Sequence, residues 1–153
     1  MGDVTIGAES SIWYGAVIRA DMAPVVVGSQ SNLQDGTIVH VDEGEPCHIG
    51  SRVGVGHRVI LHGCTVEDEC LIGMGSVLLN GVHIGGGSVV AAGAVLPEGM
   101  RVPRGALVMG VPARIVRQVD ERLARRIEGT WRHYVGQASA HRAGRFPLQR
   151  PPE

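Results

Sequence analysis

The 153-residue chain contains no lysine, and its five aromatic residues are Trp13, Tyr14, Trp131, Tyr134 and Phe146. The lack of lysine excludes Schiff-base chemistry and the lysine of a phosphate-binding loop. The Gly-x-Ser-x-Gly motif of serine hydrolases and the Gly-x-Gly-x-x-Gly motif of dinucleotide-binding folds are also missing. With so few aromatic residues, the core must consist of small aliphatic side chains in a regular arrangement.

The charge balance and hydropathy of the chain exclude several kinds of partner. Its 14 basic residues, all arginine, and 15 acidic residues leave a formal net charge of −1. This balance offers no electrostatic attraction for nucleic acid or for an anionic membrane, and no apolar stretch approaches the roughly 20 residues of a membrane span. The chain start lacks the charged and apolar parts of a secretion signal. We expect a cytoplasmic protein with no nucleic-acid and no membrane partner.

Glycine is abundant, at 23 residues, and aliphatic residues recur at a regular interval. The interval is six positions in most places. It is one residue shorter between Leu61 and Val66, and two longer gaps predict loops at residues 20–24 and 42–46. The series is Ile6, Ile12, Ile18, Val27, Leu33, Val39, Ile49, Val55, Leu61, Val66, Ile72, Leu78, Ile84, Val90 and Leu96. A period of six fits neither a helix nor an alternating strand. It predicts short strands joined by tight turns, three to a coil, with coils about 4.8 Å apart. Residues 1–112 are therefore expected to form an all-β solenoid.

The repeat changes after Pro112. Apolar residues between Ile115 and Tyr134 follow one another at intervals of three or four, which predicts an amphipathic α-helix over residues 113–143. Such a helix is expected to pack on the solenoid and brace it. Its arginines are interleaved with acidic residues, which is typical of a solvated helix face. Residues 144–153 contain three of the prolines and are expected to be a disordered tail.

The register of the repeat brings certain polar residues together. Arg19, His40 and His62 each follow the third inward residue of a coil, so they should stack on one face. Stacked strands are about 5 Å apart, and two imidazoles at that distance can share one metal. His57 falls in a different column, together with Asp35, so its own chain cannot easily bring it to the other two. Threefold packing of the prisms would do so, which predicts a metal held between the subunits of a homotrimer.

These residues lie in segments that resemble the γ-class carbonic anhydrases, a family within the hexapeptide-repeat, left-handed parallel β-helix superfamily. The segments are Arg19-Ala20-Asp21, Asn32-Leu33-Gln34-Asp35-Gly36, Val39-His40, Gly54-Val55-Gly56-His57-Arg58 and Leu61-His62-Gly63-Cys64. The single hexads occur in many acyltransferases, whereas the ordered set of arginine, glutamine-aspartate and three histidines is specific. The resemblance covers roughly residues 2–117.

The resemblance implies an enzyme with a bound metal. It implies a left-handed parallel β-helix that assembles into a homotrimer, with Zn²⁺, or Fe²⁺ or Co²⁺ in its place, on His40, His57 and His62. The implied activity is that of a zinc-dependent carbonate dehydratase, a lyase that hydrates CO₂ reversibly to bicarbonate by means of a metal-bound hydroxide.

Further roles follow from the same resemblance. Gln34 is implied to position the metal-bound water, and Arg19 and Asp35 are implied to form an ion pair near the trimer interface. Asn80 and Tyr134 match positions that line the pocket in close relatives.

Proton transfer is the point at which the chain departs from the family pattern. A glutamate that follows Arg-x-Asp in active members is replaced here by Met22, whereas a second relay glutamate has a match in Glu43. Two alternatives therefore stay open. One is a non-catalytic, metal-stabilised trimeric scaffold, and the other is a coenzyme A-dependent hexapeptide acyltransferase.

Overall fold

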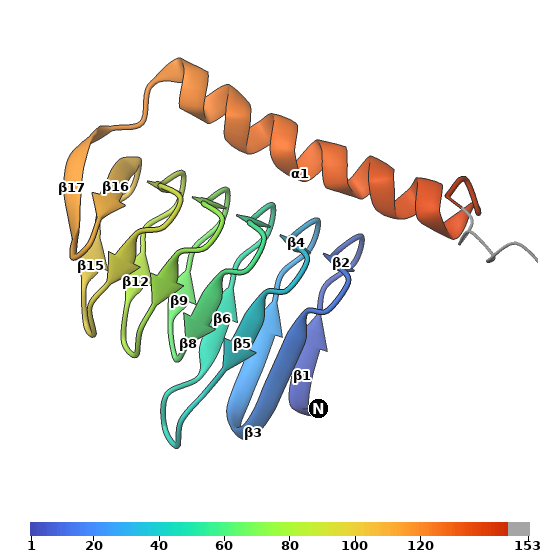
Figure 1. The fold of residues 1–153 in the computed structure, drawn as a ribbon, viewed down its shortest axis with the longest axis horizontal. Helices are drawn as coiled ribbons and strands as arrows, with labels where there is room; N and C mark the ends of the chain where they lie inside the picture. Colours follow the sequence, from blue (N-terminus) through green and yellow to red (C-terminus); the bar gives the residue numbers. More distant parts are fainter. Residues whose placement is uncertain (147–153) are drawn as a thin grey trace, which may run out of the picture.

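The computed structural model describes residues 1–146 and shows a stack of β-coils with one long helix alongside it (Figure 1). The expected solenoid is confirmed. Each coil contributes one short strand to each of three faces, and neighbouring coils pair in parallel. The first face consists of β1 (Gly2–Ile6), the second half of β3 (Val17–Val27), β6 (Cys47–Ile49), β9 (Thr65–Val66), β12 (His83–Ile84) and β15 (Arg101–Val102).

The other two faces follow the same order along the stack. The second face consists of β2 (Ser11–Ile12), β4 (Asn32–Leu33), β7 (Gly54–Val55), β10 (Leu71–Ile72), β13 (Val89–Val90) and β16 (Ala106–Gly110). The third face consists of the first half of β3, β5 (Ile38–His40), β8 (Ile60–His62), β11 (Val77–Leu78) and β14 (Val95–Leu96).

The core is a set of aliphatic columns inside the solenoid. Leu33, Val55 and Ile72 pair in register in successive coils, and each is 0% exposed. All three cysteines are free thiols buried in the same hydrophobic core. The hexad period therefore corresponds to the spacing of one inward side chain per strand, as the sequence indicates.

The longer interval before Val27 does not form the loop that we expected at residues 20–24. These residues belong to β3, which continues from the third face around a corner to the first. Ala20 aligns with Gly2 of β1 and Val25 aligns with Val4, so residues 21–24 are extra residues that bulge between two paired positions of one strand. The second expected loop is present, since Asp42 and Glu45 close a turn between β5 and β6.

The boundary of the C-terminal helix also differs from the prediction. Residues 113–118 form strand β17 (Ala113–Gln118), which pairs antiparallel with β16, and the helix α1 spans Glu121–Arg142. Pairing with β16 covers the backbone of the last coil, which would otherwise be an open sheet edge. The helix begins where the Asp120 side chain accepts a hydrogen bond from the Leu123 amide, a normal N-cap.

Helix α1 runs back along the second face, as Figure 1 shows, and contacts β2, β4 and β7. Ile127 is buried against Leu107 and Val89, with Trp131 packed beside them. The expected bracing helix is therefore present. Within the described residues, no helix is long and apolar enough to cross a bilayer. Most of the tail expected to be disordered, residues 147–153, lies outside the described residues.

Candidate metal centre

The third face brings two histidines into contact. His40 at the end of β5 is in register with His62 at the end of β8, and Arg19 of β3 is in register with His40. The Nδ1 atom of His40 lies 2.9 Å from Nε2 of His62. Two nitrogens bound to one tetrahedral zinc at 2.0–2.1 Å are about 3.3 Å apart. The predicted stacking is confirmed, and the spacing of the two rings is close to that of two ligands of one metal.

A carboxylate that sequence reasoning missed lies beside this pair. Asp42, His40 and His62 each offer a ligand atom, and these atoms lie within 4.8 Å of one another. The Oδ1 atom of Asp42 is 3.9 Å from Nε2 of His62. The turn that follows β5 places Asp42 there, and its position two residues after His40 was the available signal.

The donor set fits a divalent transition metal. The Nε2 atom of His40 is buried and has no hydrogen-bond partner within residues 1–146. Its nearest carboxylate oxygen, Oδ1 of Asp21, is 3.5 Å away, which is too long for a good hydrogen bond. Buried polar atoms without a partner are rare in proteins, and a metal shared with His62 would satisfy this one once the His40 ring turns to present Nε2 in place of Nδ1. Imidazole nitrogens and a carboxylate oxygen are common ligands of Zn²⁺.

Asn80 is held tightly at the same place. Its Oδ1 atom is 2.6 Å from Nδ1 of His62, and its Nδ2 atom donates a hydrogen bond of 2.8 Å to Oδ2 of Asp42. The residue therefore lies next to the candidate metal ligands, where the resemblance places a pocket-lining group, and it contacts one of them directly.

His57 is kept away from the other histidines. It follows β7 at the corner between the second and third faces, and its Nδ1 atom pairs with Oδ2 of Asp35 at 2.9 Å. Both side chains are more than 40% exposed and line an open cavity of about 450 Å³ together with Met74. His57 lies in the turn at the start of the third face, whereas His62 ends β8 on that face.

Two further predicted residues lie on the side of His57. Tyr134 of α1 packs edge-on against Trp13, with 5.2 Å between ring centroids. Burial raises the pKa of Tyr134, and the negative charge of Asp35 raises it further. Gln34 is buried just after β4, next to Asp35 in the chain, and donates a 3.0 Å hydrogen bond to Asn32. The predicted site is therefore split into a third-face group (Arg19, His40, His62, Asn80) and a corner group (Gln34, Asp35, His57, Tyr134).

The predicted pair of Arg19 and Asp35 is not formed within one chain. Arg19 instead hydrogen-bonds Asp21, which lowers the pKa of that carboxyl group, and Asp35 contacts His57. A contact between Arg19 and Asp35 across subunits stays a prediction. Glu43 is exposed in the turn after β5, so its carboxylate can reach solvent.

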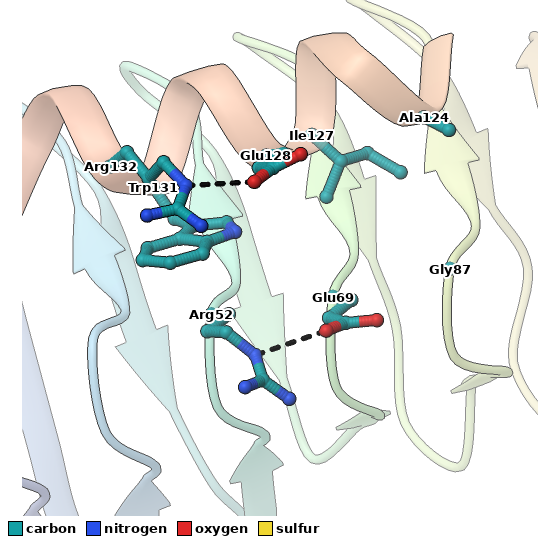
Figure 2. Close-up of a pocket in the computed structure, with 8 residues that line it drawn as sticks. All are labelled: Arg52, Glu69, Gly87, Ala124, Ile127, Glu128, Trp131 and Arg132. Atoms are coloured by element: carbon teal, nitrogen blue, oxygen red, sulfur yellow. Dashed lines mark hydrogen bonds and ion pairs between the residues drawn. The ribbon is translucent and has the colours of Figure 1, made fainter. Parts of the chain in front are cut away.

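A groove between α1 and the solenoid contains none of the predicted site residues (Figure 2). It has a volume of about 440 Å³ and contains two ion pairs. Arg52 pairs with Glu69 at 3.1 Å, and Arg132 pairs with Glu128 at 2.8 Å while its guanidinium lies over the ring of Trp131. Because these charges compensate each other, the groove offers no net charge to a ligand.

Comparison with known proteins decides the family. A carbonic anhydrase of Geobacillus kaustophilus is 49% identical over 142 residues, which is 93% of this chain and 78% of that protein. The chain belongs to the γ-class carbonic anhydrase family. The mitochondrial γ carbonic anhydrase 1 of Arabidopsis thaliana is 44% identical over 94% of this chain and 54% of its own length. The γ-carbonic anhydrase resemblance of the sequence is thereby confirmed.

The wider superfamily is also evident. Residues 63–98 match the family model of the bacterial transferase hexapeptide (six repeats). A solved structure of a hexapeptide transferase family protein from Anaplasma phagocytophilum superimposes with a TM-score of 0.87 at 37% identity, over 91% of this chain and 82% of that one. The γ-carbonic anhydrase fold is thus shared with proteins that carry transferase names.

Proposed function

We propose that this protein is a metal-dependent enzyme that hydrates CO₂ reversibly to bicarbonate at sites between the subunits of a homotrimer. The observation that carries the proposal is the split site. One chain holds two imidazole nitrogens at 2.9 Å on its third face, and it holds the third histidine apart from them, at the corner between the second and third faces and paired with Asp35. The names of the relatives support the reaction.

Exposed apolar side chains beside both groups support the assembly. Val17, Ile38 and Ile60 form a column on the third face and are between 37% and 51% exposed. Tyr14 and Met74 flank Asp35 and His57 at the corner and are 63% and 55% exposed. Contiguous exposed apolar surface next to an incomplete polar site is typical of a subunit interface. A cyclic trimer would bury both columns and complete the site.

The residues of this chain have separable tasks in such a site. His40 and His62, with His57 of a neighbouring subunit, would hold the metal. When bound, the metal would act as a Lewis acid that lowers the pKa of water. Gln34 and Tyr134 would arrive with His57 and orient substrate and water by hydrogen bonds. Glu43 would accept the proton that each hydration releases. The free thiols of the chain are consistent with a cytoplasmic location, which we retain in the proposal.

The assay that tests this function is CO₂ hydration by protein purified without oxygen and with its metal content measured. We expect about one metal per subunit and hydration that stops when a chelator removes the metal and returns with Zn²⁺. Bound metal without hydration would support the non-catalytic scaffold instead. Acetyl transfer from coenzyme A by metal-free protein would favour the acyltransferase, which the transferase names of structural neighbours keep as the second candidate.

Glu43 should limit the turnover of the enzyme through proton transfer. Replacing Glu43 by alanine should lower kcat at least about tenfold in weak buffer and leave kcat/KM nearly unchanged, because a proton relay acts after CO₂ attack. Imidazole buffer should restore part of the rate, and Met22→Glu should raise kcat. Glu98→Ala, which removes an exposed carboxylate from a later turn, is the matched control. Equal kcat values for the Glu43 and Glu98 variants in weak buffer would contradict the relay.

A further inference from the structure

We propose that Asp42 is a positioning residue that acts through Asn80 to fix the tautomer of His62 and so prepares it to bind the metal. This inference rests on the proposed metal site and adds a residue that neither the repeat nor the family resemblance indicates. Asp42, Asn80 and His62 form a continuous chain of two hydrogen bonds, 2.8 Å and 2.6 Å long.

The direction of both hydrogen bonds follows from the chemistry of Asp42. An ionised carboxylate can only accept hydrogen bonds. The atom of Asn80 that faces Asp42 must therefore be the donor, Nδ2, and the atom that faces His62 must be the acceptor, Oδ1. Because Oδ1 cannot donate, Nδ1 of His62 must carry the proton. The carboxylate thus dictates the orientation of the Asn80 amide.

The consequence for His62 is a lone pair at Nε2. A neutral imidazole has one protonated nitrogen and one that can bind a metal, and the hydrogen bond of the first selects the second. Nε2 of His62 is the atom that lies 2.9 Å from the His40 ring. Without this chain of hydrogen bonds, His62 would populate both tautomers, and one of them has a proton where the metal should bind.

Gly63 provides an independent sign that this placement of Asn80 matters. Its backbone has a φ of +52°, and a Cβ atom at this position would collide with Oδ1 of Asn80 and would lie 3.0 Å from Cβ of Glu45. The residue directly after His62 therefore leaves the space that the amide oxygen needs in order to reach Nδ1 of His62. A larger residue here would push Asn80 away without changing any group in the chain of hydrogen bonds.

Zn²⁺ affinity is the first measurement, made by competition with a chromophoric chelator. Asp42→Asn and Asn80→Ala should each weaken Zn²⁺ binding about 10- to 100-fold, as is usual when the partner of a ligating histidine is lost. The double variant D42N/N80D should recover most of the affinity, since a carboxylate at position 80 accepts from Nδ1 of His62 and from an amide at position 42. If Asp42 is itself a metal ligand, the double variant will stay as weak as Asp42→Asn, and the positioning role is overturned.

The second measurement is the ¹⁵N chemical shift of the His62 ring in metal-free protein. We expect the Nδ1–H tautomer in the natural protein and a mixture of tautomers in Asp42→Asn. A protonated Nε2 in the natural protein would overturn the proposal. This readout needs neither metal nor activity, so it separates the inference from the proposed function. Asp42-dependent Zn²⁺ affinity without CO₂ hydration would uphold the inference and refute the function.

A comparison of Gly63→Ala with Gly87→Ala separates the contact with Asn80 from the backbone strain of alanine at a positive φ. Both positions have a positive φ, +52° and +71°, but a Cβ atom at Gly87 would meet nothing within 4 Å. We expect Gly63→Ala to lose Zn²⁺ affinity as Asn80→Ala does and Gly87→Ala to keep it. Equal Zn²⁺ affinities for the two glycine variants would count against the role of Asn80.

Discussion

Mixing two inactive variants, His40→Ala and His57→Ala, is expected to restore metal binding and CO₂ hydration. Each variant alone should lose nearly all bound metal, because every site would lack one of its three ligands. In mixed trimers, a His57→Ala subunit still presents His40 and His62, and a neighbouring His40→Ala subunit still presents His57. Random exchange in equal amounts completes about a quarter of the interfaces of a cyclic trimer. Metal content and hydration rate should both rise to about that share of the natural values.

The matched control mixes His40→Ala with His62→Ala after the same exchange of subunits. Both histidines stand on the same face of one chain, in register and 2.9 Å apart at their ring nitrogens. Every third face in the mixture therefore lacks one ligand, and no interface can be completed. Recovery in this control, or no recovery in the first mixture despite proven exchange, would refute a site shared between subunits.

The second large effect is expected from Gly73→Ala, in the hexad of β10. A Cβ atom on Gly73 would lie within 2.7 Å of three backbone atoms of the next coil, at Val90, Ala91 and Ala92. Those atoms cannot move aside, because the amide of Gly73 itself donates to the carbonyl of Val90 at 2.8 Å. We expect a loss of at least about 3 kcal/mol in the free energy of unfolding, at the upper end of overpacking effects. Chemical denaturation measures it.

Gly87→Ala is the control for this stability effect as well. Its positive φ makes alanine unfavourable, but no atom of the described part of the chain lies within 4 Å of the added methyl group. The expected loss is about 1 kcal/mol, the usual difference where glycine alone adopts the conformation freely. If the two alanine variants unfold at the same denaturant concentration, close approach of the coils is not the reason for glycine at position 73.

The sequence by itself determined the repeat and everything that depends on register. In a solenoid, residues one coil apart in the chain are neighbours in space, so the period of six places Arg19, His40 and His62 on one face without further information. The same reasoning separated His57 from that face and put it with Asp35. The aliphatic columns and the scarcity of aromatic residues likewise indicated the core.

Two elements were predicted less well because their structure depends on a neighbour that the local pattern does not reveal. Residues 20–24 break the period and suggest a loop between strands, but they form a bulge within β3, because Ala20 and Val25 on either side of it pair with β1. Residues 113–118 have helical spacing of apolar residues, yet they form an antiparallel strand because their backbone pairs with the open edge of β16. In both cases, hydrogen bonds to a partner strand outweigh the local preference.

Only the tertiary structure decided the surroundings of the histidines. Asp42 and Asn80 are 38 residues apart in the chain, and their hydrogen bond exists because a turn of one coil reaches a corner two coils later. Tyr134 comes within range of the Asp35 charge because the helix returns along the second face. Register predicts which residues share a face, since it is set by backbone pairing. The direction in which a side chain points and the hydrogen bonds that it makes depend on loops and on the helix, which do not follow the repeat.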